Sequence, residues 1–276
     1  MRTQSELIGN HPIVPNFFGR WLLGNDIPVT STKRHRSLVG ILPTSDEELI
    51  DWLAKLLIIH HYDEYRLERL KEKYKEIGFE KYAEEHRKLP RFDNTKKGNL
   101  AEILLSEYIE NSLGRKLVKH FKLRYNPNVD QAMKGDDHLM VDLIDDKGDM
   151  QGKLYLGESK FRTKPTKQTV TDIVKALSRD KKPLSLTYIV DQIAKSDKVL
   201  ANKLDDLIID DIKGSGNLIY AGLLLSNGET ETIVESHLNS DNPTFVLISL
   251  GIDDPERLVN LAFKKAEFYM KNPELV

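Results

Sequence analysis

Three charged side chains lie where an apolar strand pattern ends, and their types and spacing suit hydrolytic chemistry. Glu158 and Lys160 are two residues apart near the end of the stretch 152–161, so they share one face of a strand. Asp137 lies at the edge of the apolar stripe in the preceding stretch, 135–143. Two carboxylates and an ammonium at the tips of paired strands suit the binding of a divalent cation and the hydrolysis of a phosphodiester bond.

The segment between these stretches predicts how they pair. Residues 145–149 are rich in the Asp and Gly that form tight turns, which predicts an antiparallel hairpin with Asp137 and Glu158 at one end. Two carboxylates held close repel each other and raise one pKa unless a cation joins them. We therefore expect Mg²⁺, with Mn²⁺ as a substitute, bound by both acids and by the backbone carbonyl of Ser159. The Lys160 ammonium would orient the attacking water or stabilise charge on the phosphate.

An acid and a lysine two residues apart also arise by chance in a chain with 30% charged residues. Other pairs with this spacing are Asp145/Lys147, Asp180/Lys182 and Asp211/Lys213. These lie in expected turns or helix ends, where solvated ion pairs contribute little. The position of Glu158 on an apolar strand distinguishes it from them.

The clearest helix before the hairpin is expected over residues 97–114, with Asn99 as its N-cap and a glycine as its stop. Glu102 falls on the apolar stripe of this helix, whereas Glu107 and Glu110 are expected to face water. Two interpretations of Glu102 stay open: an acid that faces the site, or a first-turn glutamate favoured by the helix dipole.

The remaining pattern predicts an α/β fold. The stretch 217–225 is apolar throughout, as expected of a strand buried on both faces. The order of helix, strand, hairpin, helices, two strands and helix is accommodated by a mixed central sheet flanked by helices. The expected helices and strands after the hairpin are, in chain order, 166–177, 185–194, 197–212, 217–225, 244–250 and 255–272.

The N-terminal third is less regular. Residues 46–61 carry leucines spaced for a core-packing helix, and residues 62–77 alternate acidic and basic side chains as a solvent-facing helix does. Residues 1–43, which include the basic cluster 33–36, have weak periodicity and are expected to pack as an irregular arm. We predict a mostly helical extension over residues 1–94 that docks on a partner.

Composition bounds the function. A chain of 276 residues can bury a substantial core, and we place the functional domain at 95–276. The absence of cysteine excludes disulfides and thiolate metal sites. No stretch approaches the roughly 20 apolar residues of a membrane helix, and the start lacks a signal-peptide pattern, so we expect a cytoplasmic protein that is not bound to a membrane.

Charge argues for local rather than global contact with nucleic acid. The net charge of −2 gives no overall attraction to phosphate, but eight basic and two acidic side chains lie within residues 160–182. We expect Lys164, Lys167 and Gln168 to contact a nucleic-acid substrate there. A solvated helix face is the alternative explanation.

The order of three motifs over residues 97–250 resembles the PD-(D/E)xK, restriction-endonuclease-like nuclease superfamily. The motifs are Glu102, Gly135-Asp136-Asp137 and Glu158-Ser159-Lys160. This resemblance implies a restriction-endonuclease-like core and a Mg²⁺-dependent deoxyribonuclease. It also implies that Asp137 and Glu158 bind the metal, that Glu102 assists them, and that Lys160 aids catalysis.

The assignment of the metal-binding aspartate has an alternative within the same motif. The superfamily usually has one residue between its glycine and its aspartate, which favours Asp137 over Asp136. The usual proline is absent, because Lys134 precedes the glycine. The choice between the two aspartates therefore stays open.

A second resemblance covers nearly the whole chain. The segments 98–102, 135–138 and 157–160, in a protein of this length, resemble the HamA family of nuclease subunits from the Hachiman antiphage system. That resemblance implies a superfamily 2 helicase partner, which restrains the nuclease until foreign or damaged DNA is met. The competing hypothesis is a catalytically inactive nuclease-fold subunit that binds DNA or the helicase. An RNA nuclease would use the same site.

Overall fold

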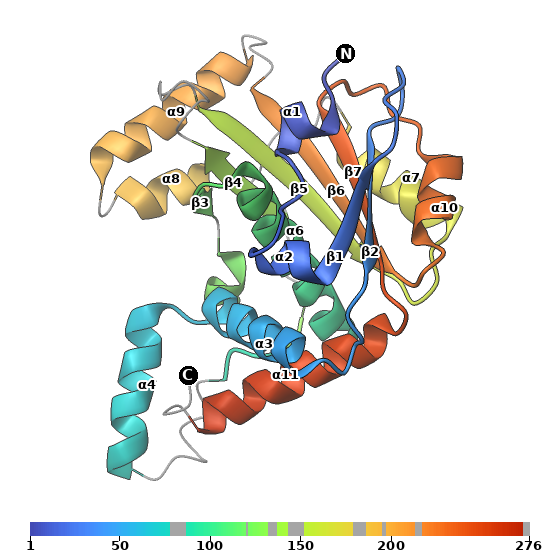
Figure 1. Cartoon of the computed structure of the whole chain (residues 1–276). Coiled ribbons are helices and arrows are strands. Elements are labelled where there is room, and N and C mark those ends of the chain that lie inside the picture. The colour runs from blue at the N-terminus through green and yellow to red at the C-terminus, as the bar shows by residue number, and fades with distance from the viewer. Residues whose placement is uncertain are drawn as a thin grey trace.

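A seven-stranded mixed sheet forms the centre of the protein in the computed structural model, which describes residues 1–77, 87–119, 121–131, 137–142, 152–178, 186–194, 197–212 and 217–272 (Figure 1). The strand order is β1-β2-β7-β6-β5-β4-β3. Strands β2, β7, β6 and β5 run parallel, and the pairs β1/β2, β5/β4 and β4/β3 are antiparallel. The strands are β1 (Leu22–Asp26), β2 (His35–Gly40), β3 (Val118–Lys119), β4 (His138–Asp142), β5 (Lys153–Phe161), β6 (Leu218–Ser226) and β7 (Phe245–Gly251).

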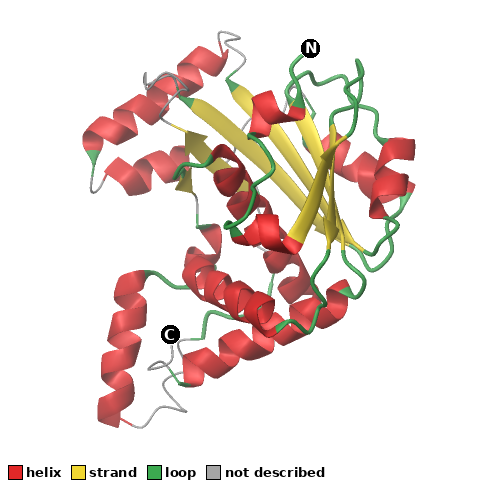
Figure 2. Ribbon diagram, viewed as in Figure 1, coloured by secondary structure: helices red, strands yellow, loops and turns green. Residues whose placement is uncertain are grey.

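Helices cover both faces of this sheet (Figure 2). One apolar core joins the sheet to α1, α2, α3, α6 and α11, and a second joins its other face to α7, α8, α9 and α10. The helices are α1 (Gln4–Ile8), α2 (Phe17–Trp21), α3 (Glu47–His61), α4 (Glu64–Ile77), α6 (Asp93–Leu113), the 3₁₀ helix η1 (Lys122–Tyr125), α7 (Lys167–Ala176), α8 (Leu186–Ala194), α9 (Lys198–Ile212), α10 (Thr230–His237) and α11 (Pro255–Lys271).

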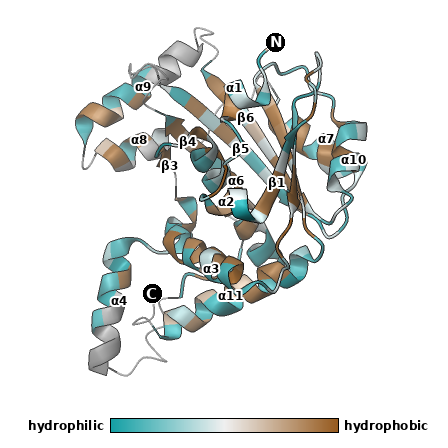
Figure 3. Ribbon diagram, viewed as in Figure 1, coloured by the Kyte–Doolittle hydropathy of each residue, from teal (hydrophilic) through white to brown (hydrophobic). Residues whose placement is uncertain are grey.

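The central strands are apolar because helices cover them on both sides. Every residue of β6 and of β7 is buried, as expected for parallel strands inside an α/β sheet. Figure 3 shows the contrast between the brown, hydrophobic ribbon of β6 and the mostly teal, hydrophilic ribbon of the coloured part of α4. On α4, Arg69 and Glu72 form an exposed i,i+3 ion pair, as predicted for a solvent-facing helix.

Helix α6 packs closely on the hairpin of β4 and β5 at Gly157. A Cβ atom at this position would lie 2.9 Å from Leu105 Cδ2 and 2.8 Å from His138 Cβ. The absence of a side chain therefore lets the helix and both strands approach one another. This contact places α6 against the end of the hairpin.

The predicted α/β fold with a mixed sheet and flanking helices is confirmed. The antiparallel pairing of β4 and β5 is also confirmed, with His138 opposite Gly157. The predicted turn at 145–149 lies outside the described residues. Within the part of the chain that the structure describes, no helix has the length and apolar character needed to cross a membrane.

Two predictions about local structure are wrong. Residues 1–43 do not form an irregular arm, because β1 and β2 belong to the same sheet as the other five strands. Asn99 is not an N-cap, because α6 begins at Asp93 and Asn99 is buried inside it, where its Nδ2 lies 2.9 Å from His61 Nε2. The division of the chain at residue 94 stays a prediction, although the N-terminal part contributes two strands to the sheet.

The basic cluster 33–36 leads into β2 rather than forming a surface arm, and Arg34, His35 and Arg36 are buried. Arg36 is 1% exposed, and its Nε and Nη2 donate to the two carboxylate oxygens of Asp26 at 2.6 and 2.8 Å. His35 is equally buried, with Nε2 lying 2.8 Å from Ser249 Oγ on β7. These side chains join the N-terminal strands to the C-terminal one.

Candidate active site

Asp137 ties the tip of β4 to β5. It directly precedes β4, and its Oδ2 accepts a hydrogen bond from the Ser159 backbone N–H at 3.2 Å. The register that pairs His138 with Gly157 brings Asp137 beside Glu158. The hairpin therefore gathers these two carboxylates at one end, as predicted.

Glu158 and Lys160 form an ion pair between Lys160 Nζ and Glu158 Oε1. Their side chains are 18% and 31% exposed, so this edge of the site opens to solvent. Burial raises the pKa of Glu158, the negative charge of Asp137 raises it further, and the Lys160 ammonium opposes both effects. The two acids therefore interact electrostatically.

Lys122, the first residue of η1, completes the cluster. Its ammonium is 3.1 Å from Glu102 Oε2 and 3.2 Å from Asp137 Oδ1, and the side chain is only 4% exposed. Burial alone would lower the pKa of Lys122, but the charges of Glu102 and Asp137 outweigh burial and raise it. A buried cation thus bridges an acid on α6 and an acid at the start of β4.

The pKa values of Glu102 and Asp137 shift in opposite directions in this cluster. Burial raises the pKa of Glu102 to about 8, because desolvation outweighs the attraction of Lys122. Burial also acts to raise the pKa of Asp137, but Lys122, the charge of His138 and the Ser159 N–H together lower it. Asp137 is therefore the acid better held in its ionised form.

A small cavity of about 20 Å³ lies beside this bridge. Its wall includes Glu102, Lys122, Asp137 and His60. A volume above about 10–15 Å³ accommodates one water molecule where polar partners are present. The cluster therefore has room for one small polar group next to its charges.

The described residues contain no group of three His, Asp or Glu side chains placed to hold a metal ion. The reason is visible in the ion pairs, since Lys122 lies between Glu102 and Asp137, and Lys160 contacts Glu158. Ammonium groups thus neutralise the acids in this arrangement.

A second buried charge network lies behind the site. Glu107 Oε1 accepts a hydrogen bond from Lys119 Nζ, and it lies 2.7 Å from His60 Nε2. Lys119 also lies 2.9 Å from Glu110 Oε1. The prediction that Glu107 and Glu110 face water is wrong, because their side chains are only 12% and 19% exposed.

Comparison with known proteins identifies the family. A model of the HamA family matches residues 15–266. The Hachiman protein HamA of Bacillus cereus is 37% identical over 276 aligned residues, which cover 97% of this chain and 96% of the relative.

The chain belongs to the HamA family.

In this HamA-family protein, the fold brings together the predicted residues Glu102, Asp137, Glu158 and Lys160, with Ser159 between the last two. Glu102 faces the cluster rather than acting as a first-turn glutamate, because α6 begins nine residues before it. The roles of these residues in catalysis and metal binding stay predictions. Asp136 lies outside the described residues, so its comparison with Asp137 stays open.

The predicted nucleic-acid contacts near the hairpin stay untested. Lys164, Lys167 and Gln168 are exposed between β5 and the first turn of α7. The Gln168 amide donates to Asp172 Oδ1 at 2.7 Å on its own helix. Three basic residues of the predicted stretch, Arg179, Lys181 and Lys182, lie outside the described residues.

Lys122 was missed in this HamA-family chain because no strand or helix pattern points to it. It lies in a short segment between Phe121 and Leu123, where a single lysine is ordinarily solvated. Only the three-dimensional packing of η1 against α6 and the hairpin brings its ammonium to the acids. The sequence offered one weak signal for Lys122: it is a lysine flanked by apolar residues, and it precedes the strand that begins after Asp137.

Proposed function

We propose that this HamA-family chain is a metal-dependent DNA endonuclease that hydrolyses phosphodiester bonds. The observation that supports it best is the convergence of Asp137, Glu158 and Lys160 at the end of the hairpin, where Ser159 N–H holds Asp137. The motif order also resembles the PD-(D/E)xK superfamily. The α/β fold by itself supports many activities, so this site is what distinguishes a nuclease.

The acids suit Mg²⁺ or Mn²⁺ by their chemistry. Asp137 and Glu158 are neighbouring carboxylates whose mutual repulsion a divalent cation would relieve. We assign these two residues as ligands, with the Ser159 carbonyl as a third and Glu102 as an assisting acid. A bound divalent cation would supply Lewis-acid polarisation of the phosphate and a more acidic water.

The protein's own groups then have separate tasks. Lys160, part exposed beside Glu158, is placed to stabilise charge on the phosphate or to orient the attacking water. Lys122 holds Glu102 and Asp137 in position from the buried side. We expect Lys164, Lys167 and Gln168 to contact the DNA backbone beyond Lys160.

The match to a Hachiman protein supports a role in antiphage defence, together with partner subunits. We propose that one partner is a superfamily 2 helicase, which restrains cleavage until foreign or damaged DNA is met. Segment 1–94 is our candidate for the docking region.

The test is cleavage by the purified chain, alone and with its helicase partner. Supercoiled DNA should be nicked in Mg²⁺ and left intact in EDTA, and an RNA of the same sequence should be cleaved less. Lys160→Ala should abolish nicking while leaving DNA binding largely intact. Lys153→Ala, at the other end of β5, is the matched control and should cleave normally. Cleavage by Lys160→Ala at the wild-type rate would refute the proposed site.

A non-catalytic subunit that binds DNA or the helicase is the second candidate. One observation favours it: within the described residues, an ammonium group contacts each of the three acids, and no three-ligand metal group is present. Such a subunit would bind DNA equally well in Mg²⁺ and in EDTA. It would cleave in neither solution, with or without the partner.

A further inference from the structure

A large cationic cavity lies between α4, the segment after residue 86, and the loop that follows η1. Its volume is about 570 Å³, within the range of ordinary ligand sites. Most such sites are lined by apolar side chains, but half of the lining residues here are charged. The cationic lining residues are Arg66, Arg69, Arg87, Lys88 and Arg124, and the acidic ones are Asp63 and Asp130.

Some of these cations are already neutralised. Arg87 Nη2 donates to Asp130 Oδ2 at 2.8 Å, and Arg69 pairs with Glu72 on α4. The Asp130 carboxylate also accepts from the Arg91 backbone N–H at 2.6 Å, which fixes this wall of the cavity. These pairs shape the cavity more than they attract an anion.

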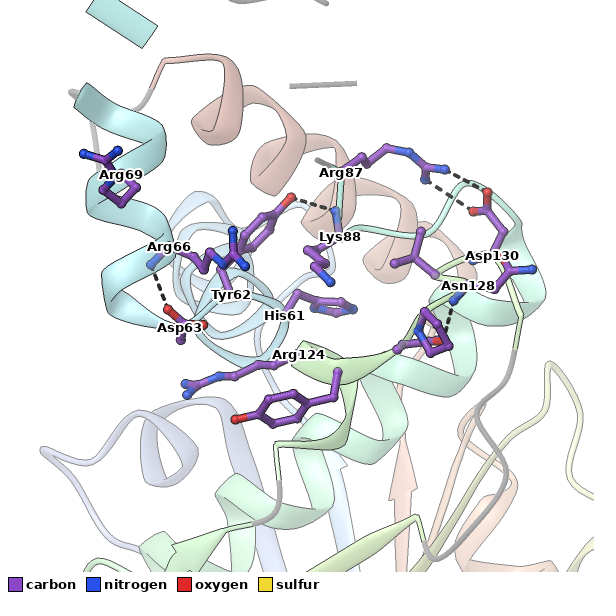
Figure 4. Close-up of a pocket in the computed structure, with 14 residues that line it drawn as sticks. His61, Tyr62, Asp63, Arg66, Arg69, Arg87, Lys88, Arg124, Asn128 and Asp130 are labelled. Atoms are coloured by element: carbon purple, nitrogen blue, oxygen red, sulfur yellow. Dashed lines mark hydrogen bonds and ion pairs between the residues drawn. The ribbon is translucent and has the colours of Figure 1, made fainter. Parts of the chain in front are cut away.

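Arg66 and Lys88 are different. Among the described residues, neither side chain has a hydrogen-bond or ion-pair partner, although the Arg66 backbone N–H donates to Asp63 Oδ1 at 2.7 Å. Figure 4 shows the two side chains reaching into the cavity from opposite walls, whereas Arg87 turns away toward Asp130. Together with Arg124 they outnumber Asp63, the remaining acid of the lining, so the cavity carries a net positive charge that attracts anions.

Arg124 supplies a fixed donor at the floor of the same cavity. Its Nε and Nη2 donate to the Ile59 carbonyl at 3.1 and 2.8 Å, and its guanidinium lies 3.8 Å from the centre of the Phe121 ring. A guanidinium held in this way loses little conformational entropy when it binds an anion. The half-exposed ring of Tyr125 adds an aromatic surface beside it.

The cavity adjoins the candidate active site through shared elements. Lys122 contacts Glu102 and Asp137 from the start of η1, and Arg124, two residues later, lines the cavity. His60 borders the small cavity and His61 the large one.

We propose that this cavity binds the phosphate groups of a nucleic-acid strand next to the phosphodiester at the acidic cluster. Arg66 and Lys88 contact the phosphates, Arg124 donates from below, and Tyr125 stacks on a base. Basic groups interspersed with an aromatic ring are the usual means of holding a single strand. This inference rests on the proposed nuclease function for the fate of the strand, but binding itself is measurable without cleavage.

The test is binding of a fluorescent single-stranded oligonucleotide to the full chain in EDTA, over a range of salt concentrations. The double variant Arg66→Gln/Lys88→Gln should bind about tenfold more weakly, and its salt dependence should fall by about 1.4 in log–log slope, about 0.7 for each lost phosphate contact. The control Lys55→Gln/Lys264→Gln removes the same charge from exposed positions on α3 and α11 and should bind as the wild type does.

Three outcomes would overturn the proposal. The first is an equal loss of affinity in both double variants, which would indicate a general charge effect. The second is competition by deoxyadenosine monophosphate at the concentration at which the oligonucleotide binds, which would assign the cavity to a free nucleotide. The third is unchanged oligonucleotide binding by the double variant. Its melting temperature should match that of the wild type; if it does not, the single variant Lys88→Gln replaces it in the same assay.

These results separate the two proposals. A wild-type chain that binds DNA through Arg66 and Lys88 but never cleaves it in Mg²⁺ would refute the nuclease function and leave the cavity assignment standing. Normal cleavage by the wild type, together with unchanged DNA binding by the double variant, would refute the cavity assignment and leave the nuclease function standing.

Discussion

Replacing Lys122 with methionine should turn a stable cluster into one that depends on a divalent cation. The substitution keeps the length of the side chain but removes the ammonium that lies 3.1 Å from Glu102 and 3.2 Å from Asp137. Removing one partner from a buried charge cluster costs about 3–5 kcal/mol, because the remaining charges stay uncompensated. At about 2–4 °C per kcal/mol for a domain of this size, the melting temperature should fall by roughly 10 °C.

The space left by the ammonium lies between two carboxylates, which suits a hard cation. Mn²⁺ at about 100 times its dissociation constant should return about 2.7 kcal/mol of stability to Lys122→Met. Thermal unfolding of each protein with and without Mn²⁺ measures this effect without any nuclease assay. Wild type should respond less, because the Lys122 ammonium already occupies the space between the two acids.

Lys96→Met is the control for this experiment. Lys96 is largely buried at 16% exposure and lies 3.1 Å from a single acid, Glu267 on α11. It should gain no stability in Mn²⁺, because one carboxylate alone does not form a site for a divalent cation. A Lys122→Met protein within about 1 kcal/mol of wild type would contradict the burial argument. An equal response of both variants to Mn²⁺ would contradict the site assignment.

Two further variants test the packing behind the site. Burial alone would raise the pKa of Glu107, but contacts with His60 and Lys119 lower it from 4.5 to about 2. The ionised carboxylate therefore adds about 3 kcal/mol to the free energy of unfolding. This stabilisation is complete above about pH 5 and is lost as the pH falls toward 2. Urea unfolding from pH 6 to 2.5 should therefore show a shallower decline for Glu107→Gln than for wild type, and parallel curves would contradict this. Gly157→Ala places a methyl group 2.9 Å from Leu105 Cδ2 and should cost about 1–3 kcal/mol by overpacking; a midpoint equal to that of wild type in the same assay at pH 7 would show that the contact relaxes freely.

Period-2 patterning was sufficient to predict the hairpin and its charged end. Glu158 and Lys160 interrupt the apolar alternation of β5 at its exit from the core, and the same is true of Asp137 before β4. Such interruptions are visible in sequence because a buried strand otherwise excludes charge. The buried strand β6 could be predicted because its sequence contains no charged residue.

The N-terminal strands were not predictable by the same rule. The start of β2 and the residue before it place His35, Arg36 and Arg34 in the interior, although their sequence resembles a surface cluster. Arg36 pairs with Asp26 on the neighbouring strand β1, and His35 contacts Ser249 from a distant part of the chain. Charges that are neutralised only by tertiary contacts cannot be recognised from local periodicity.

Helix α6 also contains buried polar residues that local periodicity does not reveal. Its apolar positions predicted a helix, but they did not predict that Asn99 and Glu107 are buried against α3. Both residues contact histidines at the end of α3, Asn99 with His61 and Glu107 with His60. The role of Lys122 could not be predicted either, because its partners lie on α6 and just before β4 and are brought to it only by the fold.

The position of β2 in the sheet has a consequence for biosynthesis. Residues 35–40 pair with residues 245–251, so β2 lacks this neighbour until β7, far later in the chain, has been synthesised. Until then β6 presents an unpaired edge, which favours aggregation over assembly. A prematurely terminated chain therefore cannot complete the framework around Asp137 and Glu158. The proposed activity of this site would therefore require that β7 has already been synthesised.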